Sequence, residues 1–417
     1  MSEKYLLLVN LSILLPFSMP FNTDMTQQHR TQVGIIGGGP SGMLLAQILA
    51  RAGIDSIVLE RTSRDRVLSR IRAGVLEWGS VETLRAAGVG ARMDAEGHVH
   101  NHVGIAWGDN AQLIDIENAS GRSMMAFGQT ALTEDLYAAR DADGQAVFHG
   151  VENVTLDGLD RNPSIQFELN GEAHLVRCDL IAGCDGYHGV SRQAIPTDKR
   201  REFEKVYPFG WLGIMSETPP LPELWYAAGE RGFALASQRN PMLSRYYVQC
   251  PLDDTVDDWS DDRFWIELLA RLPEHLAADI VTGPSIEKSI APLRSFVCEP
   301  MQWGTLFLVG DAAHIVPPTG AKGLNLAISD VHYLSRGIIQ HYKSGDSTGL
   351  DQYSAVALRR VWATTKFSWQ MTNLLHRFPE NDAIDIRLKQ AEFEFLASNT
   401  AAQAALGSQY AGIPYED

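Results

Sequence analysis

A glycine-rich turn between a short apolar strand and a helix constrains the fold of this chain more than any other feature. The apolar run Val33–Ile36 leads directly into Gly37-Gly-Gly-Pro-Ser-Gly42, and apolar residues with helical spacing follow. In a G-x-G-x-x-G fingerprint, the first glycine permits a tight turn, the second lets a pyrophosphate approach the backbone, and the third lets the helix pack on the strand. Gly37, Gly39 and Gly42 hold these positions. The segment therefore predicts a βαβ unit that binds a dinucleotide.

The acidic residue at the end of the next predicted strand narrows the choice of dinucleotide. Strand Ser56–Leu59 ends in Glu60, at the distance from the glycines where a carboxylate accepts hydrogen bonds from a ribose. A carboxylate in this place suits an unphosphorylated ribose and repels a 2′-phosphate. Glu60 therefore favours the adenosine half of FAD or NAD over NADPH, and the choice between FAD and NAD stays open at this point.

Two later segments repeat the pattern of a strand that runs into a glycine turn. Leu180–Gly183 runs into Cys184-Asp-Gly186, and Leu306–Val309 delivers Gly310-Asp311. With the first turn, and in this order, they resemble the dinucleotide, Asp-Gly and Gly-Asp motifs of the FAD-dependent aromatic-ring monooxygenases. The resemblance implies an FAD-binding domain in which Asp311 holds the ribityl chain, while Asp185 and Gly186 serve both FAD and the nicotinamide coenzyme.

Several longer stretches are similar to the members of that family that act on 4-hydroxybenzoate. They are Val206–Gly213, Gly232–Arg239, Ser244–Gln249, Ser289–Phe296 and His314–Asn325. The resemblance, which runs from about Val33 to Tyr415, implies hydroxylation to 3,4-dihydroxybenzoate (protocatechuate) with NAD(P)H and O₂ through a flavin C4a-hydroperoxide. An FAD-dependent hydroxylase of another hydroxybenzoate or of salicylate would keep the three flavin motifs and is the main alternative. A non-catalytic relative would be expected to lose Asp311.

An aromatic acid needs a cationic partner, and the resemblance supplies one. Ser237, Arg239 and Tyr247 match the residues that hold the benzoate carboxylate in the family. A guanidinium takes a carboxylate through two parallel hydrogen bonds, and two hydroxyls fix its orientation. By spacing alone, Arg239 reads equally well as a surface charge and Ser237 as an ordinary strand hydroxyl.

At the phenol end, the resemblance implies catalytic roles for Tyr226, Tyr410, His100 and Pro318. The two tyrosines match a relay for the substrate's phenolic proton, His100 matches its exit, and the Pro318 carbonyl meets the substrate hydroxyl. A free phenol titrates near 10 and a histidine near 6.5, so a relay that ends in histidine delivers the proton to water at neutral pH. Histidines also stand at positions 98 and 102, and this alternation fits a solvated strand better than a metal site.

The remaining cofactor contacts are also implied by the resemblance. The residues expected at FAD are Gly37, Gly39, Ser41, Gly42, Glu60, Arg72, Gln129, Asp311, Lys322, Leu324 and Asn325. The residues expected at the visiting coenzyme are Arg61, Arg70, Arg72, His188 and Arg294. Arg245 matches an arginine coupled to movement of the flavin ring, and Lys322 adds positive potential beside anionic reactants. Thr62 and Arg66 stand where NADPH-preferring members carry a glutamine and a tyrosine. Arg61, Arg64 and Arg66 can nevertheless bind a 2′-phosphate, so NADPH is favoured over NADH without excluding NADH.

Charge and cysteine content limit the partners and the compartment. The chain has 35 basic and 51 acidic side chains, a net charge of −16, which argues against a broad surface for nucleic acid or anionic membrane. An anionic substrate therefore requires a local basic pocket. Four scattered cysteines do not form a disulfide framework, and they suit a reducing cytoplasm.

The chain is expected to be α/β, with a doubly wound FAD-binding domain (30–200), a mixed-sheet substrate domain (201–293), and the Gly-Asp motif followed by C-terminal helices (294–417). The helical region resembles the homodimer interface of the family. Residues 1–24 lie outside the resemblance. Lys4 and the apolar stretch after it resemble the start of a signal peptide, but no cleavage signature follows, so we interpret these residues as an upstream extension before Met25.

Overall fold

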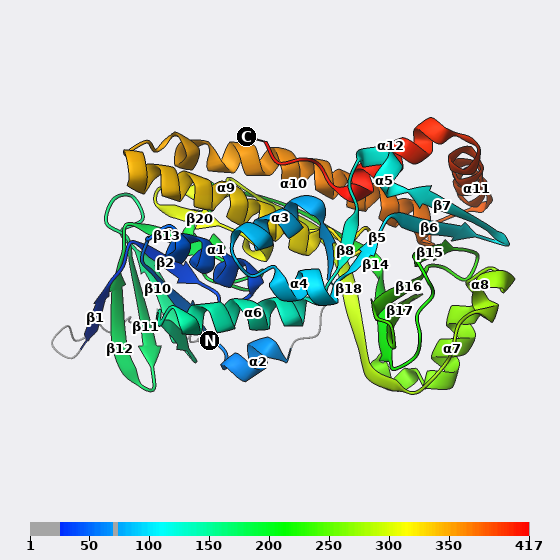
Figure 1. The fold of residues 1–417 in the computed structure, drawn as a ribbon, viewed down its shortest axis with the longest axis horizontal. Coiled ribbons are helices and arrows are strands. Elements are labelled where there is room, and N and C mark those ends of the chain that lie inside the picture. The colour runs from blue at the N-terminus through cyan, green and yellow to red at the C-terminus, as the bar shows by residue number, and fades with distance from the viewer. Residues whose placement is uncertain (1–25, 70–73, 417) are drawn as a thin grey trace, which may run out of the picture.

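The computed structural model describes residues 26–69 and 74–416. The expectations for residues 1–24, Arg70 and Arg72 therefore lie outside the described residues. The described chain forms two lobes that are joined by long helices and strands (Figure 1). One lobe holds the predicted dinucleotide turn, and the other holds the largest sheet.

The first lobe is built on a six-stranded sheet of order β19-β20-β13-β2-β3-β9. All of its pairings are parallel except β19 with β20. The strands are β2 (Val33–Ile36), β3 (Ser56–Glu60), β9 (Val147–His149), β13 (Leu180–Gly183), β19 (Gln302–Trp303) and β20 (Leu306–Leu308). Every residue of β2 and β13 is buried, as expected for parallel strands covered on both faces.

Helices cover one face of this sheet and a second sheet packs on the other. α1 (Pro40–Arg51) contacts β2 and β3 and lies beside α6 (Gln129–Ala142) and α9 (Gly323–Ser344). The second sheet has the order β1-β12-β11-β10. Its strands are β1 (Gln27–Arg30), β10 (Glu152–Asp157), β11 (Ser164–Leu169) and β12 (Glu172–Arg177). It reaches the parallel sheet at Gly34, where an added Cβ would lie 2.5 Å from Ile165 Cδ1.

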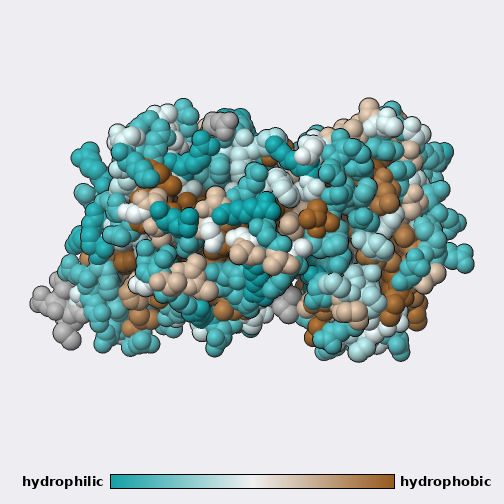
Figure 2. Space-filling view, viewed as in Figure 1, coloured by the Kyte–Doolittle hydropathy of each residue, from teal (hydrophilic) through white to brown (hydrophobic). Residues whose placement is uncertain are grey.

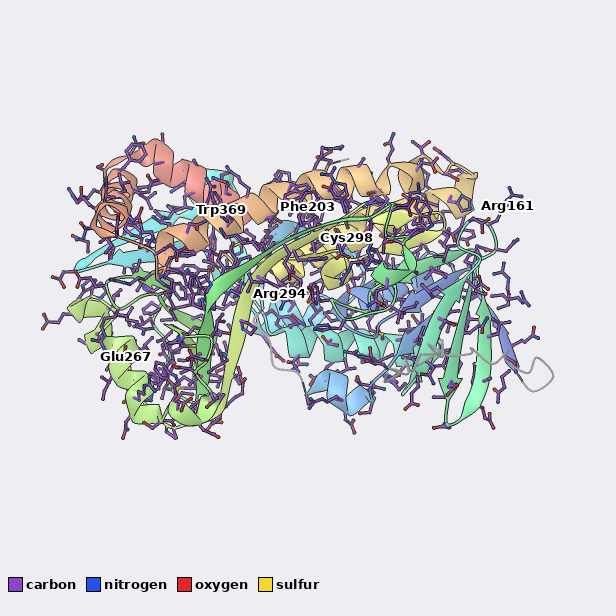
Figure 3. The ribbon with its side chains drawn as sticks, turned by 180° about the vertical axis from the view of Figure 1, so that it is seen from behind. Arg161, Phe203, Glu267, Arg294, Cys298 and Trp369 are labelled. Atoms are coloured by element: carbon purple, nitrogen blue, oxygen red, sulfur yellow. The ribbon has the colours of Figure 1, made fainter. Side chains whose placement is uncertain are left out.

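The second lobe is built on an eight-stranded sheet of order β21-β18-β14-β17-β16-β15-β6-β7. The pairing of β15 with β6 is parallel and the others are antiparallel, so the sheet is mixed. The strands are β6 (His102–Trp107), β7 (Asn110–Asp115), β14 (Arg201–Ser216), β15 (Leu224–Ala228), β16 (Ala234–Asn240), β17 (Leu243–Cys250), β18 (Ser285–Glu299) and β21 (His314–Ile315). Seen from behind, β14 and β18 run together from this lobe toward the first, with Arg294 along their course (Figure 3).

Alternate residues of β14 pack on different helices. Leu212 and Ile214 share a core with α7 (Asp261–Leu269) and α8 (Glu274–Ala278). Phe209 and Trp211 share a core with the C-terminal helices. These helices are α10 (Thr348–Leu375), α11 (Ala383–Ser398) and α12 (Thr400–Ala411). Because successive strand residues point to opposite faces, the sheet is buried on both sides.

The remaining elements are short. A three-stranded sheet has the order β4-β8-β5. The strands are β4 (Val75–Glu77), β5 (His98–His100) and β8 (Met124–Ala126), and the short helices are α2 (Arg64–Leu68), α3 (Trp78–Ala86), α4 (Ala91–Glu96), α5 (Ile116–Ser120), η2 (Arg192–Ala194), η3 (Val256–Asp258) and η4 (Gly310–Ala312).

The architecture confirms the expected α/β class with a mixed sheet and C-terminal helices. The eight-stranded sheet draws strands from both sides of residue 200, because β6 pairs with both β7 and β15, and β18 crosses residue 293. The face in Figure 2 is mostly hydrophilic, with hydrophobic patches on both lobes. Among the described residues, no helix combines the length and apolar character needed to cross a membrane.

Candidate active site

A cavity of about 580 Å³ lies between the two lobes. Its walls come from the fingerprint turn, the eight-stranded sheet and the segment between β20 and α9. The predicted residues that line it are Gly37, Gly39, Ser41, Glu60, Arg61, Gln129, Tyr226, Ser237, Arg239, Arg245, Tyr247, Arg294, Asp311, Pro318, Lys322 and Leu324. The structure therefore brings predicted dinucleotide and substrate residues to one cavity.

The three glycines of the fingerprint differ in their geometry. Gly37 has φ +110°, a backbone conformation that disfavours side chains, and a Cβ there would lie 2.2 Å from the Cys184 carbonyl oxygen. A Cβ on Gly42 would lie 2.0 Å from the Gly37 carbonyl oxygen. A Cβ on Gly39 would meet nothing within 4 Å, and this residue faces the cavity. The turn thus needs Gly37 and Gly42 for its own backbone, and Gly39 keeps the cavity side open.

Glu60 is held in place at the end of β3. Its Oε2 accepts a hydrogen bond from the Gly38 N–H at 2.7 Å, and its Oε1 accepts from the Thr62 N–H at 2.9 Å and from the Thr62 hydroxyl at 2.7 Å. Each carboxylate oxygen accepts two hydrogen bonds, so Oε2 keeps capacity for another donor. A half-buried, oriented carboxylate at this edge suits a ribose hydroxyl.

The two later motifs lie at the ends of β13, which pairs with β2, and of β20, which pairs with β13. Asp185 Oδ2 accepts hydrogen bonds from the N–H and the hydroxyl of Ser191, both at 2.9 Å. Asp185 Oδ1 is buried without a hydrogen-bond partner among the described residues, and burial raises the pKa of this carboxyl. The Gly310 N–H donates to Asp330 Oδ2 at 2.8 Å, which fixes the turn that carries Asp311.

These features fit an elongated cofactor with a pyrophosphate at its centre. The N-terminus of α1 follows Gly39 and has no side-chain cap, so its N–H groups are available to an anion. The unpartnered Asp185 Oδ1 and the open side of Gly39 face the same region. FAD would be held there by the fingerprint turn, Glu60, Gln129 and Asp311.

At the other end of the cavity, β16 and β17 place a cation between hydroxyls. Arg239 Nε is buried and has no hydrogen-bond partner among the described residues, whereas Nη1 donates to the Gln238 carbonyl at 3.2 Å. Burial lowers the pKa of Arg239. Ser237 and Tyr247 line the cavity beside it. A buried guanidinium with an unused donor is unfavourable until an anion occupies the site.

Two buried tyrosines meet beside the cavity, and Tyr226 lines it. Tyr226 Oη and Tyr410 Oη are 2.9 Å apart, and the Gly320 N–H donates to Tyr226 Oη at 3.2 Å. Burial raises the pKa of Tyr226 to about 12 and that of Tyr410 well above its ordinary value. Both side chains therefore keep their protons at neutral pH, and a proton can pass between them through hydroxyl groups.

The residues expected to handle the coenzyme occupy two places. His188 packs edge-on against the Tyr187 ring, with ring centroids 5.0 Å apart, and the Arg294 guanidinium lies 4.8 Å from the centre of the same ring. Arg61 lines the cavity at the fingerprint side. Arg64 instead pairs with Asp141 at 2.7 Å.

Comparison with known proteins identifies the chain. It matches the family described as FAD binding domain over residues 30–368. It is also 50% identical over 392 residues to the p-hydroxybenzoate hydroxylase of Acinetobacter baylyi, a match that spans 94% of this chain and 97% of that enzyme. This chain belongs to the FAD-binding monooxygenases. A more distant monooxygenase, the 3-(3-hydroxy-phenyl)propionate/3-hydroxycinnamic acid hydroxylase of Mycobacterium avium, is 26% identical over 330 residues, which are 72% of this chain and 53% of that enzyme.

Solved structures of other monooxygenases share the fold. The crystal structure of p-nitrophenol 4-monooxygenase from Pseudomonas putida aligns with a TM-score of 0.79 at 17% identity, over 93% of this chain and 100% of that one. A probable FAD-dependent monooxygenase from Pseudomonas aeruginosa aligns with a TM-score of 0.73 at 20% identity, over 88% of this chain and 100% of that one. At this level of identity the likeness concerns the fold alone.

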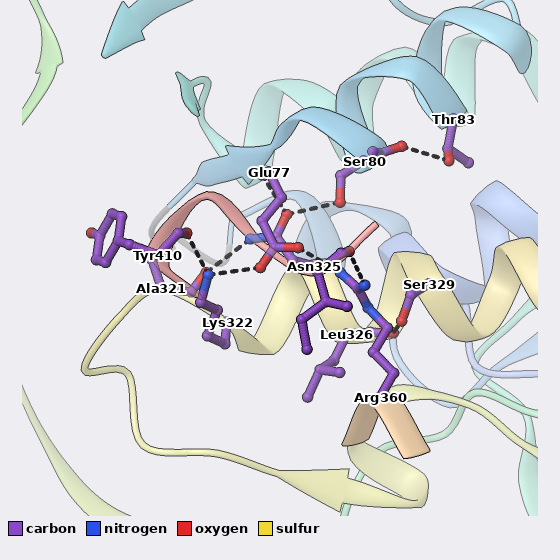
Figure 4. Close-up of polar contacts among 12 residues, drawn as sticks. Glu77, Ser80, Thr83, Ala321, Lys322, Asn325, Leu326, Ser329, Arg360 and Tyr410 are labelled. Carbon is purple, nitrogen blue, oxygen red and sulfur yellow. Dashed lines mark hydrogen bonds and ion pairs between the residues drawn. The ribbon is translucent and has the colours of Figure 1, made fainter. Parts of the chain in front are cut away.

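The monooxygenase has a buried charge network that sequence reasoning did not find (Figure 4). Glu77 Oε1 accepts from Lys322 Nζ at 2.8 Å, and Glu77 Oε2 accepts from Arg360 Nη2 at 2.6 Å. Lys322 Nζ also donates to the Tyr410 carbonyl at 2.6 Å. At most 5% of each charged residue is exposed. Two cations around one carboxylate leave a net positive charge, and Lys322 presents it to the cavity.

Asn325 supports this part of the monooxygenase rather than lining its cavity. Its Oδ1 accepts from the Glu77 N–H and the Ser80 hydroxyl, both at 2.8 Å. Its Nδ2 donates to the Val75 carbonyl at 2.9 Å and to the Ala321 carbonyl at 2.8 Å. Ala321 has φ +55°, an uncommon conformation for a residue with a side chain. Asn325 therefore ties β4 to the loop that precedes α9.

Arg245 and His100, two of the predicted site residues, lie in different surroundings. Arg245 is buried, forms an ion pair with Glu287, and donates to Ser289 Oγ at 3.2 Å. His100 lies buried in β5 and, like Gly42, Tyr410, His188 and Asn325, is outside the cavity lining. In the described part of the chain, no group of three or more His, Cys, Asp or Glu side chains is arranged to hold a metal. The four cysteines are buried and unpaired.

Proposed function

We propose that this protein is an FAD-dependent monooxygenase that hydroxylates 4-hydroxybenzoate at its 3-position. The balanced reaction consumes NAD(P)H, a proton and O₂, and yields 3,4-dihydroxybenzoate, NAD(P)⁺ and water. The observation that carries this proposal is one cavity lined by two unlike groups: Arg239, whose buried Nε has no hydrogen-bond partner among the described residues, and Tyr226, whose hydroxyl meets that of Tyr410. These two groups match the carboxylate and the phenol of one small substrate.

The carboxylate end orients the substrate. Arg239 gives it two charge-assisted hydrogen bonds, and the hydroxyls of Ser237 and Tyr247 limit its rotation. Arg239 Nε is buried without a hydrogen-bond partner among the described residues, and a bound carboxylate accepts a hydrogen bond from it. Binding thereby offsets the cost of a buried donor that has no acceptor. An aromatic acid is therefore preferred over a neutral phenol.

The phenol end controls the proton. A phenolate releases electron density to its ortho carbon and reacts with an electrophilic oxygen donor far more readily than a phenol. Tyr226 accepts the substrate proton while passing its own to Tyr410, 2.9 Å away. The net positive charge of the Glu77, Lys322 and Arg360 network favours the phenolate, since a nearby cation lowers the pKa of an acid. Pro318 lines the cavity and offers its carbonyl to the substrate hydroxyl.

FAD, when bound, supplies the redox and oxygen-transfer chemistry. The protein supplies the rest: a fixed substrate, a route for its proton, and a cavity that excludes bulk water during transfer. The residues of the relay and of the carboxylate pocket therefore determine how tightly coenzyme oxidation is coupled to product formation.

The decisive experiment measures product, not coenzyme consumption alone. Purified protein with FAD is incubated with 4-hydroxybenzoate and NADPH or NADH, and the products are separated by chromatography. We expect 3,4-dihydroxybenzoate in about the same amount as the coenzyme oxidised. Salicylate and 3-hydroxybenzoate serve as comparison substrates. Hydrogen peroxide without 3,4-dihydroxybenzoate would refute the substrate assignment.

Three finer properties belong to the same proposal. NADPH is preferred over NADH, which the ratio of kcat/KM for the two coenzymes tests. The protein works as a homodimer through its helical region, which light scattering of the FAD-bound protein tests. It acts in the cytoplasm, where FAD and NAD(P)H are available and where the unpaired buried cysteines stay reduced; fractionation of cells that express the full chain tests this location.

A further inference from the structure

His100 has no direct route to solvent, although it is expected to release the relay's proton. Only 5% of its side chain is exposed. Its Nδ1 is buried without a hydrogen-bond partner among the described residues. Burial lowers the pKa of His100, and the neighbouring His98 lowers it further, so a proton that reaches this ring is readily given up. The question is which group receives it.

One carboxylate faces this unpartnered nitrogen. Glu223, one residue before β15, has its Oε2 3.5 Å from His100 Nδ1, and this oxygen is also buried without a hydrogen-bond partner in the described structure. The other oxygen, Oε1, lies 3.4 Å from His102 Nδ1. His102 Nε2 in turn lies 3.9 Å from Asp115 Oδ2. Glu223 therefore stands between a buried and a half-exposed imidazole.

Exposure increases step by step along these groups. The exposed fraction of the side chain rises from 5% at His100 to 26% at Glu223, 39% at His102 and 40% at Asp115. The order follows from the fold, because the parallel pairing of β15 with β6 sets Leu224 beside Val103 and brings the residues before them together. Acceptors of increasing exposure give a proton a path outward.

The same corner of the fold carries the tyrosine relay. Asp115 ends β7 and caps α5, and α12, which holds Tyr410, packs on both elements. At Gly407, a Cβ would lie 3.3 Å from the Asp115 carbonyl oxygen. The titratable groups around His100 are His98 on its own strand, Glu223 before β15, and His102 and Asp115 beyond it; on the paired strand β8, the residue opposite His100 is Met124.

We propose that Glu223 and His102 carry the substrate's proton from His100 to solvent, with Asp115 orienting His102. His100 Nδ1 gives its proton to Glu223 Oε2, the carboxylic acid group turns and gives this proton to His102 Nδ1, and the resulting imidazolium releases its Nε2 proton to water. No electrons move, and Glu223 is again a carboxylate. His102 is again neutral, and it returns to its starting tautomer by exchanging a proton with water. This path extends the proposed function, on which it rests, by assigning the exit of its proton.

The test follows proton release rather than product. Full-length FAD-bound protein is mixed with 4-hydroxybenzoate in weak buffer, and a pH-indicator dye reports the release rate by stopped flow. Glu223→Gln and His102→Gln keep similar shapes but cannot relay a proton in the same way. We expect release to slow on the order of 10-fold, less than the roughly 100-fold often supplied by a positioned acid–base group because water partly substitutes. Added imidazole should restore the rate.

Controls separate this path from its alternatives. Glu117→Gln removes an exposed carboxylate on the neighbouring helix α5 and should leave the rate unchanged. FAD content and the substrate dissociation constant should be unchanged in all variants, which excludes a merely structural effect. The path would be overturned if Glu223→Gln and His102→Gln released protons at the rate of the unaltered protein. It would also be overturned if His98→Gln were the only variant that slowed release.

A different result refutes the proposed function: the unaltered protein forms no 3,4-dihydroxybenzoate. Because proton release on ligand binding is recorded without turnover, slowed and imidazole-rescued release in Glu223→Gln would still support the path in that case. Unslowed release would refute it whether or not product forms.

Discussion

Replacement of Arg360 by methionine should destabilise the protein through Glu77. Arg360 donates to Glu77 Oε2 and to the Ile413 carbonyl, and its guanidinium lies 4.9 Å from the centre of the Tyr415 ring. Methionine keeps much of the packing but leaves the buried carboxylate with Lys322 as its remaining cation. Removal of one partner of a buried ion pair costs about 3–5 kcal/mol. Because Lys322 stays, we expect the lower value.

The size of the effect can be expressed as a melting temperature. Unfolding entropy is roughly 2.1 cal/mol/K per residue, so 417 residues give about 0.9 kcal/mol/K. A loss of about 3 kcal/mol then lowers the midpoint by about 3 °C. Differential scanning calorimetry, or the green fluorescence of flavin released on unfolding, would record it at equal protein and FAD concentrations.

A neighbouring arginine provides the matched control. Arg359 pairs with Glu416 on the surface, where more than half of its side chain is exposed. Exposed pairs contribute little, so Arg359→Met should melt close to the parent. Adding Glu77→Gln to Arg360→Met should lower the melting temperature further, since the buried Lys322 then loses its remaining carboxylate. Equal melting of the two arginine variants, or a double variant as stable as Arg360→Met, would refute the reasoning.

Three further predictions concern the site and its surroundings. Tyr226→Phe should leave flavin reduction nearly intact but increase peroxide at the expense of product, because the phenolic proton has lost its first acceptor; an unchanged ratio of product to coenzyme contradicts the relay. Arg239→Met should raise the substrate dissociation constant at least about 30-fold, from the roughly 2 kcal/mol or more that truncating a buried charge pair costs, and equal titration curves would exclude its role. Burial lowers the pKa of His376 to about 3, so its protonation in the unfolded chain should reduce the free energy of unfolding as pH falls from about 6.5 toward 3; His376→Gln should flatten this decline in urea titrations, and parallel curves would show that His376 is not its cause.

The sequence was most informative where backbone geometry dictates the residue type. Gly37 and Gly42 are required by a positive φ and by a contact with the Gly37 carbonyl, so their spacing alone predicted the turn. Glu60 followed from its place at the end of β3. The expected FAD cofactor and monooxygenase family are confirmed by the match to known proteins. The individual roles of the predicted site residues stay predictions that the proposed experiments test.

Long-range partners could not be derived in the same way. Glu77 and Arg360 meet only after α10 packs beside the three-stranded sheet, and neither residue stands in a recognisable motif. Ala321 adopts a positive φ without a glycine to signal it. The alternation of His98, His100 and His102 was visible in the sequence, but Glu223, the group that connects two of them, is brought there by strand pairing across the fold.

The parallel pairing of β6 with β15 also has a consequence for synthesis of the chain. Val103 pairs with Leu224, so ribosomes must add 121 further residues before the edge of β6 can be covered. At 5–20 residues per second, this takes roughly 6–24 s. During that time β6 and β7 form a hairpin with an open edge, a known template for aggregation. Fragments that end near residue 200 should therefore be poorly soluble, and the lobe that contains the dinucleotide turn should fold well only together with its neighbour.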